Sequence, residues 1–338
     1  MIPISIIIPA YNEEKSIARA IKSSTAQSLK EIEIIVVDDA STDRTAEIVK
    51  QIATTDNRVK LISHNKNMGL NQSRLTGLSI AQGEYIQFLD ADDTLQKEVA
   101  ERLYNYAISS KNDIVMMGCQ HYHKLLKFKI TLFSPRSFFK EEQYSTLELY
   151  PNLLCKFGFS LSLCDKLYRK DFIKNIWTYA EPNFYGEDML TNLRIFNTDA
   201  SLGWIDYIGY NYTTGGASKK SATDTWNDDK KLYNRCCTVL EEINASTPEN
   251  MHALACGAVN SFIYSISQQI VNPFASTRKC KEWIKTELQS DFWDNIIPHL
   301  NGDHKAIAQR DADGTLNIAR QHLNAHRLSY LALKLLMQ

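Results

Sequence analysis

The chain has 338 residues, of which 44% are hydrophobic and 23% are charged. This is the composition of a globular protein that forms one large domain with an appendage, or two domains. The formal net charge is -1 and the Lys and Arg residues are dispersed, so the broad basic face of a nucleic-acid-binding protein is missing. We therefore expect no nucleic-acid partner.

The cysteines and the N-terminus indicate a cellular compartment. Seven cysteines form an odd set without a CxxC pair or a metal-ligand spacing, which favours reduced thiols in a cytoplasmic protein. Met1 leads directly into the isoleucine-rich residues 4–8 without a basic leader, and no apolar run approaches the length of a membrane span. We expect a cytoplasmic chain that is neither secreted nor integral to a bilayer.

Short β-branched runs alternate with segments of helical period along the first 120 residues. The predicted strands are residues 4–8, 32–37, 59–63 and 85–89. The predicted helices pair Ile17 with Ile21, pair Ile48 with Ile52, and cover residues 71–81. Four such βα units in a row predict an open α/β sheet with crossover helices.

Polar loops follow the first, second and fourth predicted strands, and we expect them to share one crevice. Residues 9–14 read PAYNEE, residues 38–43 read DDASTD, and residues 90–93 read DADD. In open α/β sheets, ligands bind beyond the carboxyl ends of the strands. Three carboxylates within four residues repel one another and lose hydration unless a cation lies among them. A divalent cation that carries a phosphate ligand is the natural occupant, so the sequence predicts chemistry on a nucleotide diphosphate.

A second acidic pair lies downstream in Gly186-Glu187-Asp188, followed by apolar residues at helical spacing. This pattern places both acids at a helix start, where the helix dipole stabilises negative charge. By itself the pattern favours an ordinary acidic helix N-terminus.

Four segments, in this order, resemble the signature of glycosyltransferase family 2, whose members have the GT-A fold. They are residues 5–13 (SIIIPAYNE), 36–43 (VVDDASTD), 67–74 (NMGLNQSR) and 83–93 (GEYIQFLDADD). The resemblance implies a Rossmann-like open mixed sheet flanked by helices. Residues 1–219 would form this catalytic domain, with nucleotide-sugar binding in about 1–120 and the acceptor region in about 120–219. Residues 220–338 would form a small helical C-terminal region.

The resemblance also implies which residues bind the donor. They are Pro9, Ala10, Tyr11, Glu13, Asp39, Arg74, Asp90 and Ala91. In this set Asp39 would bind the base, Arg74 would help to order the nucleoside site, and Asp90 would hold the ribose or the donor sugar. A charge on a helix surface is the alternative for Arg74. Asp92 would ligate Mn²⁺ or Mg²⁺, which suits hard oxygen ligands and neutralises the departing diphosphate.

Glu187 and Asp188 resemble the family's Glu-Asp motif. The resemblance implies that Asp188 is the general base and that Glu187 orients the acceptor hydroxyl. Direct displacement inverts the anomeric configuration, so an α-linked UDP-sugar would give a β-glycoside. The implied activity is transfer of a hexose or an N-acetylhexosamine from a UDP-sugar to a glycan or lipid-linked glycan acceptor. Bacterial lipooligosaccharide, O-antigen and capsule synthesis use such reactions.

Longer helical stretches replace the alternation from about residue 220 onward. They are residues 232–243, 252–270 and 316–337. The last one combines Leu328, Leu331 and Leu335 with Arg320, Arg327 and Lys334. That combination suits peripheral contact with the cytoplasmic face of the inner membrane. Packing against the catalytic domain or against a second subunit in a homodimer is the alternative, and the one that we favour.

Other functional classes share parts of this pattern. A dinucleotide enzyme would carry a glycine-rich phosphate loop after the first strand, but residues 9–14 contain no glycine. A glycosidase could use Asp92 and Asp188 as its two carboxylates, but the nucleotide motifs would then have no role. A non-catalytic relative that binds nucleotide sugars would be expected to lack Asp92 or Asp188, and both are present. We therefore expect an enzyme.

Overall fold

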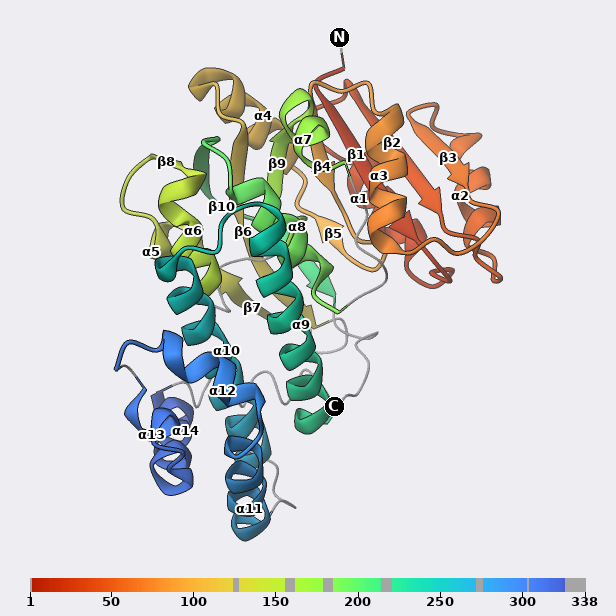
Figure 1. The fold of residues 1–338 in the computed structure, drawn as a ribbon. Coiled ribbons are helices and arrows are strands. Elements are labelled where there is room, and N and C mark those ends of the chain that lie inside the picture. Colours follow the sequence, from red (N-terminus) through yellow and green to blue (C-terminus); the bar gives the residue numbers. More distant parts are fainter. Residues whose placement is uncertain are drawn as a thin grey trace. The chain divides into compact units, whose positions relative to one another are not determined.

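The fold is taken from a computed structural model, shown in Figure 1. The structure describes residues 2–123, 128–155, 162–178, 185–213, 221–271, 276–302 and 304–325. The chain divides into two compact units: Met1–Glu148 with Ser160–Gly216, and Leu149–Phe159 with Ala217–Gln338. The domain boundary at residue 219 stays a prediction, and the structure adds a short segment from the middle of the chain to the second unit.

Among the residues that the structure describes, the first unit contains one mixed sheet of ten strands. The strands are β1 Ile4–Ala10, β2 Ile32–Asp38, β3 Val59–Ser63, β4 Tyr85–Phe88, β5 Thr94–Leu95, β6 Ile114–His123, β7 Phe128–Phe133, β8 Gln143–Ser145, β9 Lys166–Arg169 and β10 Ser201–Thr213. Their order is β3-β2-β1-β4-β9-β6-β10-β5, with β7 beside β6 and β8 beside β10. The strands β1 to β4 are parallel to one another, whereas β9 is antiparallel to both of its neighbours. The expected open mixed sheet is therefore confirmed.

Helices flank this sheet. They are α1 Ile17–Thr25, α2 Thr45–Ala53, α3 Leu70–Ile80, α4 Val99–Ser110, α5 Pro135–Phe138, α7 Lys170–Ile176 and α8 Glu187–Phe196. Helix α6, Thr146–Cys155, begins in this unit and continues into the second. Helix α3 crosses in front of the strands in Figure 1. It packs closely on β1 because Gly77 has no side chain: a Cβ atom there would lie 2.4 Å from the Ile7 side chain.

The predicted elements of the first 95 residues are present. Ile17 and Ile21 are fully buried on α1, as their spacing predicts. On α2 the fully buried residues are Thr45 and Val49, and Ile48 is only half-buried. Ile52, the other member of the predicted pair, is also only half-buried, because α2 packs at the sheet's edge strand β3 with Thr45 and Val49 turned inward.

The strand register brings the three polar loops together. Ala10 at the end of β1 pairs with Asp38 at the end of β2, and Ile7 of β1 pairs with Phe88 at the end of β4. The backbone N–H of Asp39 then donates to the Ala10 carbonyl at 2.8 Å. The loops after β1, β2 and β4 therefore begin side by side at one edge of the sheet.

The described part of the second unit is helical. Besides most of α6 it contains α9 Ala222–Glu242, α10 Pro248–Val271, α11 Thr277–Leu288, α12 Phe292–Ile296, the 3₁₀ helix η1 Ile297–His299, α13 Lys305–Ala308 and α14 Ala312–Ala325. The rings of Trp226, Phe262 and Trp293 contact one another in its core. No helix among the described residues is both long enough and apolar enough to cross a bilayer. Leu328, Leu331 and Leu335, on which the membrane-contact prediction depends, lie outside the described residues.

Candidate active site

A pocket of about 500 Å³ lies where the loops after β1, β2 and β4 meet. The predicted donor and metal residues that line it are Pro9, Ala10, Tyr11, Glu13, Asp39, Asp90, Ala91 and Asp92. The structure thus brings together all of the donor-binding and metal-binding residues in the prediction except Arg74.

Hydrogen bonds between the loops after β1 and β2 form one wall of this pocket. The backbone N–H of Asn12 donates to Ser41 Oγ at 3.0 Å, and the N–H of Thr42 returns a bond to Asn12 Oδ1 at 2.8 Å. The N–H of Glu13 donates to Thr45 Oγ1 at 2.7 Å. Asn12 has a φ of 55°, a left-handed conformation that asparagine tolerates better than most residues. These bonds fix the backbone from which Tyr11 and Glu13 extend, and the Tyr11 ring is 47% exposed.

Asp39, in the loop after β2, also lines the pocket. Its buried carboxylate accepts bonds from the backbone N–H groups of Met68 and Gly69, at 2.8 and 2.7 Å, and from the ring of His64 at 2.7 Å. Gly69 has a φ of 92°, a backbone angle that residues other than glycine rarely adopt. Asp39 therefore organises the loop that leads into α3 and also faces the pocket.

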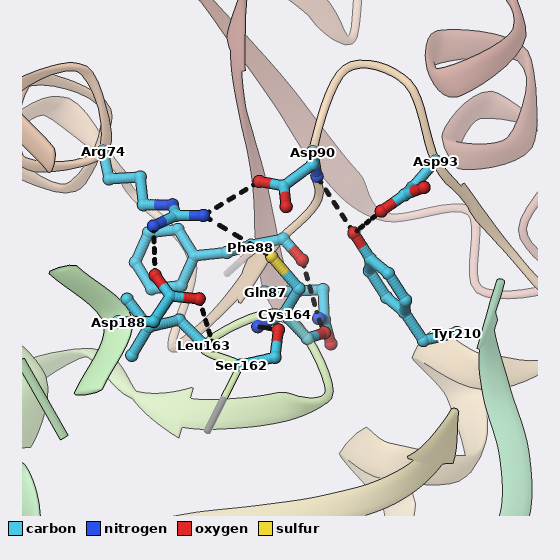
Figure 2. A network of polar contacts seen from close by, with 10 residues as sticks. All are labelled: Arg74, Gln87, Phe88, Asp90, Asp93, Ser162, Leu163, Cys164, Asp188 and Tyr210. Carbon is cyan, nitrogen blue, oxygen red and sulfur yellow. Dashed lines mark hydrogen bonds and ion pairs between the residues drawn. The ribbon is translucent and has the colours of Figure 1, made fainter. Parts of the chain in front are cut away.

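Figure 2 shows how strand β10 holds the acidic loop that follows β4. The Tyr210 hydroxyl accepts the backbone N–H of Asp90 at 3.2 Å and donates to Asp93 Oδ2 at 2.8 Å. The N–H of Thr213 donates to Asp93 Oδ1 at 2.7 Å. Burial, with the charges of Asp90 and Asp92, raises the pKa of Asp93 to about 8. Asp93 thus acts as the buried anchor of this loop and does not line the pocket.

Asp92 lies near other carboxylates, and their negative charge outweighs the positive charge of Arg19. Burial, followed by the charges of Asp90 and Glu13, raises the pKa of Asp92 to about 6. Arg19 of α1 donates to the Asp92 carbonyl, which fixes the backbone rather than neutralising the carboxylate. In the described part of the chain, no three His, Cys, Asp or Glu side chains are arranged to hold a metal ion by themselves. The carboxylate oxygens and their unbalanced charge fit a divalent cation.

Arg74 of α3 does not line the pocket but joins two carboxylates, as Figure 2 shows. Its Nη2 atom is 2.9 Å from Asp90 Oδ1, and its Nη1 atom is 2.6 Å from Asp188 Oδ1. Burial would lower the pKa of this guanidinium, but the charges of Asp188 and Asp90 raise it well above its ordinary value. The side chain is 1% exposed, so the surface-charge alternative is wrong. The sequence predicts that Arg74 helps to order the nucleoside site. Its observed ion pairs instead orient the carboxylates of Asp90 and Asp188.

Asp188 and Glu187 begin helix α8, as the sequence predicts. Asp188 Oδ2 accepts the backbone N–H of Leu163 at 3.2 Å, so the carboxylate is held from two sides. Burial, and then the charge of Asp188, raises the pKa of Glu187 to about 7 although Arg74 opposes the shift. Neither acid lines the pocket. Asp188 is nevertheless close to the pocket residue Asp90, because the guanidinium of Arg74 contacts both carboxylates.

Sequence reasoning missed several residues of the site. Asn67, Gly69, Leu70 and Ser73 also line the pocket. All four lie within residues 67–74, which carried part of the resemblance, so that segment held a signal for them. Tyr210 and Cys164 were not among the predicted site residues. The Cys164 thiol lies 3.9 Å from Arg74 Nη2, and its contact partners are distant in sequence.

Comparisons with known proteins agree with this geometry. The family model described as Glycosyl transferase family 2 matches residues 5–175. The chain is 32% identical over 247 residues to the cholesterol galactosyltransferase of Borreliella burgdorferi, over 70% of this chain and 67% of that protein. Three further relatives are matched over only 32 to 44% of their own length.

Two solved structures share the fold. S. aureus TarS 1-349 in complex with UDP-GlcNAc aligns with a TM-score of 0.64 at 20% identity, over 96% of this chain and 92% of that chain. The mannosyltransferase PcManGT from Pyrobaculum calidifontis, in complex with GDP-Man and Mn²⁺, aligns with a TM-score of 0.52 at 14% identity, over 94% and 85%. The sheet, the four motif segments and the family match agree, and the chain belongs to glycosyltransferase family 2 with the GT-A fold.

Proposed function

We propose that this chain is an inverting, metal-dependent glycosyltransferase that moves a hexose or an N-acetylhexosamine from a UDP-sugar to a glycan or lipid-linked glycan, with a β-linkage. One observation carries the proposal: a fully buried Arg74 joins Asp90, on the pocket wall, to Asp188 at the start of α8. A donor in the pocket and a base on the acceptor side would thereby be held within one compact unit.

The pocket suits a nucleoside diphosphate. Tyr11 offers an exposed ring for stacking on a base, and Asp39 offers a buried acceptor for a base N–H. A pocket of about 500 Å³ lies within the range of small-molecule sites. TarS, which shares the fold, has been solved with UDP-GlcNAc, and this supports a UDP-sugar as the donor.

Asp92 is the proposed protein ligand of Mn²⁺ or Mg²⁺, with the donor's phosphate oxygens as the other ligands. The bound cation would neutralise the charge that develops on the departing diphosphate. The excess negative charge around Asp92 supports this assignment, because a cation would relieve it. PcManGT, another protein with this fold, was solved with Mn²⁺ and a nucleotide sugar.

Asp188 is the proposed general base. An acceptor hydroxyl is a weak nucleophile, so a carboxylate that takes its proton during attack contributes on the order of 10² to 10⁴-fold in rate. The oxygen of the acceptor forms a bond to the anomeric carbon from the face opposite the diphosphate. The bond from that carbon to the phosphate oxygen breaks, UDP leaves, and the configuration inverts.

Arg74 and the Leu163 N–H hold the Asp188 carboxylate in one orientation for this step. Asp188 Oδ1 bonds the positively charged Arg74 at 2.6 Å, whereas Oδ2 accepts only the longer bond from the neutral Leu163 N–H at 3.2 Å, so Oδ2 is the better placed atom to accept a proton. Glu187, the next residue, is the proposed contact for the acceptor hydroxyl.

The acceptor is proposed as a glycan or a lipid-linked glycan of a bacterial surface polysaccharide. The relative from Borreliella burgdorferi is described as a cholesterol galactosyltransferase, and a lipid acceptor there supports a lipid-linked one here. We place the reaction in the cytoplasm, with peripheral contact at the inner membrane where the acceptor is lipid-linked. For residues 316–337 we favour packing against the catalytic domain or against a second subunit in a homodimer.

The test is the variant Asp188→Asn, which keeps the shape of the side chain and removes its basicity. We expect it to bind UDP and Mn²⁺ like the parent chain, measured by calorimetry, and to lose about 10² to 10⁴-fold in sugar transfer, measured as UDP release that depends on acceptor. Asp171→Asn on the exposed face of α7 is the matched control and should transfer normally. Near-normal transfer by Asp188→Asn would reject the base. Absence of transfer by the parent chain, with UDP binding intact, would favour a non-catalytic nucleotide-sugar-binding protein.

A further inference from the structure

The hydrogen bonds of Asp39 leave it one open position. Oδ1 accepts from the His64 ring at 2.7 Å and from the Met68 N–H at 2.8 Å, whereas Oδ2 accepts one bond from the described residues, that of the Gly69 N–H at 2.7 Å. Each carboxylate oxygen has two lone pairs, so Oδ1 is filled and Oδ2 keeps one acceptor site. Asp39 lines the pocket, so this single site is what the side chain can offer to a ligand.

His64 is itself fixed from both sides. Its Nδ1 faces a carboxylate, which only accepts, so Nδ1 carries the hydrogen. The other ring nitrogen, Nε2, lies 3.0 Å from Thr76 Oγ1 on α3, and in the neutral ring it accepts the Thr76 hydroxyl hydrogen. The His64 backbone N–H also donates to the Asp38 carbonyl at 2.9 Å, and its side chain is 9% exposed. Thr76, His64 and Asp39 therefore form a chain of hydrogen bonds from α3 to the pocket wall.

A hydrogen-bond acceptor that is held in place can discriminate between two nucleobases, whereas a mobile acceptor can bond to both. Uracil presents a ring N–H at position 3, whereas cytosine presents a lone pair there and an amino group beside it. A carboxylate held in place bonds the ring N–H of uracil and repels the lone pair of cytosine. A carboxylate free to rotate can reach the cytosine amino group instead, and the difference between the two bases shrinks.

We propose that His64 and Thr76 are positioning residues that set the nucleobase specificity of this site: they hold Asp39 so that its one open acceptor selects a base with a ring N–H over cytosine. This inference rests on the proposed nucleotide-sugar donor and goes beyond it by naming side chains outside the pocket lining. A hydrogen bond to a charged acceptor corresponds to about 10- to 100-fold in affinity, which sets the scale of the expected selectivity.

UDP and CDP form a matched pair of probes, because they differ only at the base. Calorimetry with the full chain should give an affinity for UDP that exceeds the affinity for CDP by at least about tenfold. His64→Gln places its amide near Nε2 and loses the bond to Asp39, so the UDP/CDP ratio should fall about tenfold. His64→Asn places its amide near Nδ1 and keeps that bond, so it should retain most of the ratio. In steady-state transfer, His64→Gln should raise the KM for the UDP-sugar more than it changes kcat.

Thr76→Val removes the hydroxyl that bonds His64 Nε2 without changing the shape of the side chain. It should also lower the UDP/CDP affinity ratio, by a smaller factor than His64→Gln. Ser79→Ala is the control on the same helix, since the Ser79 hydroxyl donates to the Thr76 backbone carbonyl and not to His64 or Asp39. A ratio that survives in folded His64→Gln, or that falls equally in the Asn and Gln variants, overturns the inference. Should His64→Gln fail to fold, an unchanged ratio in Thr76→Val overturns it. A parent chain that binds no UDP contradicts the proposed function itself, which is a separate outcome.

Discussion

A single buried side chain, Arg74, determines how the acids of this site are arranged. Its guanidinium is almost fully buried and is balanced by Asp90 and Asp188. A buried charge that loses one of its partners typically costs 3–5 kcal/mol, so both acids constrain Arg74 as much as it constrains them. The sequence placed Arg74 within a motif but could not show its contact with Asp188, because the two residues are 114 positions apart.

Glu187 gives a prediction at this same scale. Burial and the Asp188 charge raise its pKa from an ordinary value of 4.5 to about 7, so the folded chain binds this proton more tightly than the unfolded chain. The contribution of Glu187 to the free energy of unfolding should therefore fall as the pH rises from about 4.5 to about 7, and then level off. Glu187→Gln cannot ionise, so its stability relative to the parent chain should increase over the same window, by roughly 3 kcal/mol at most.

Urea denaturation of both chains at about pH 5 and about pH 8 measures this difference. Comparing the two chains at each pH removes the contributions of all other titrating groups. A difference in stability that does not change with pH, or that shifts against the variant at the higher pH, would show that Glu187 is not held in its protonated form.

At the scale of elements, strand β10 supports the loop that follows β4. The Tyr210 hydroxyl joins the Asp90 backbone to Asp93, and the Thr213 N–H completes the anchor. The carboxyl end of β4 was predictable because an apolar run ends there in acids. The hydrogen bonds from β10 that support this loop were not predictable, because Tyr210 lies 120 residues away from Asp90 and only the folded sheet brings them together.

Tyr210→Phe tests the role of β10. The variant leaves the Asp90 N–H and one Asp93 oxygen without this partner, so we expect a loss of about 1–3 kcal/mol in stability. The affinity for Mn²⁺ in the presence of UDP should fall roughly threefold to tenfold, because the loop that carries Asp92 is held less firmly. Denaturation and calorimetry measure the two effects.

Tyr207→Phe on the same strand is the control for this variant, because Tyr207 contacts Arg102 of α4 rather than the acidic loop. A Tyr210→Phe variant that is destabilised but binds Mn²⁺ and UDP like the control would reduce Tyr210 to a structural role.

At the scale of the whole molecule, the sequence predicted the first unit better than the second. Alternating apolar runs and polar loops were sufficient for β1 to β4, and the topology of an open sheet placed Ala10, Asp39 and Asp92 around one pocket. Contacts between distant segments, such as Arg74 with Asp188, required the structure. The second unit was recognised as helical from its periodicity, but the assignment of Leu149–Phe159 to it depends on packing that no local pattern shows.

The central claim is that Asp92 holds a divalent cation against the diphosphate of a nucleotide sugar, and calorimetric UDP binding with and without Mn²⁺ tests it directly. In the parent chain, Mn²⁺ should tighten UDP binding by about tenfold or more, since the metal links the protein carboxylate to the phosphates. Asp92→Ala should abolish that gain and leave the weaker metal-independent binding in place. An Asp92→Ala chain that shows the full gain with Mn²⁺ would contradict the account.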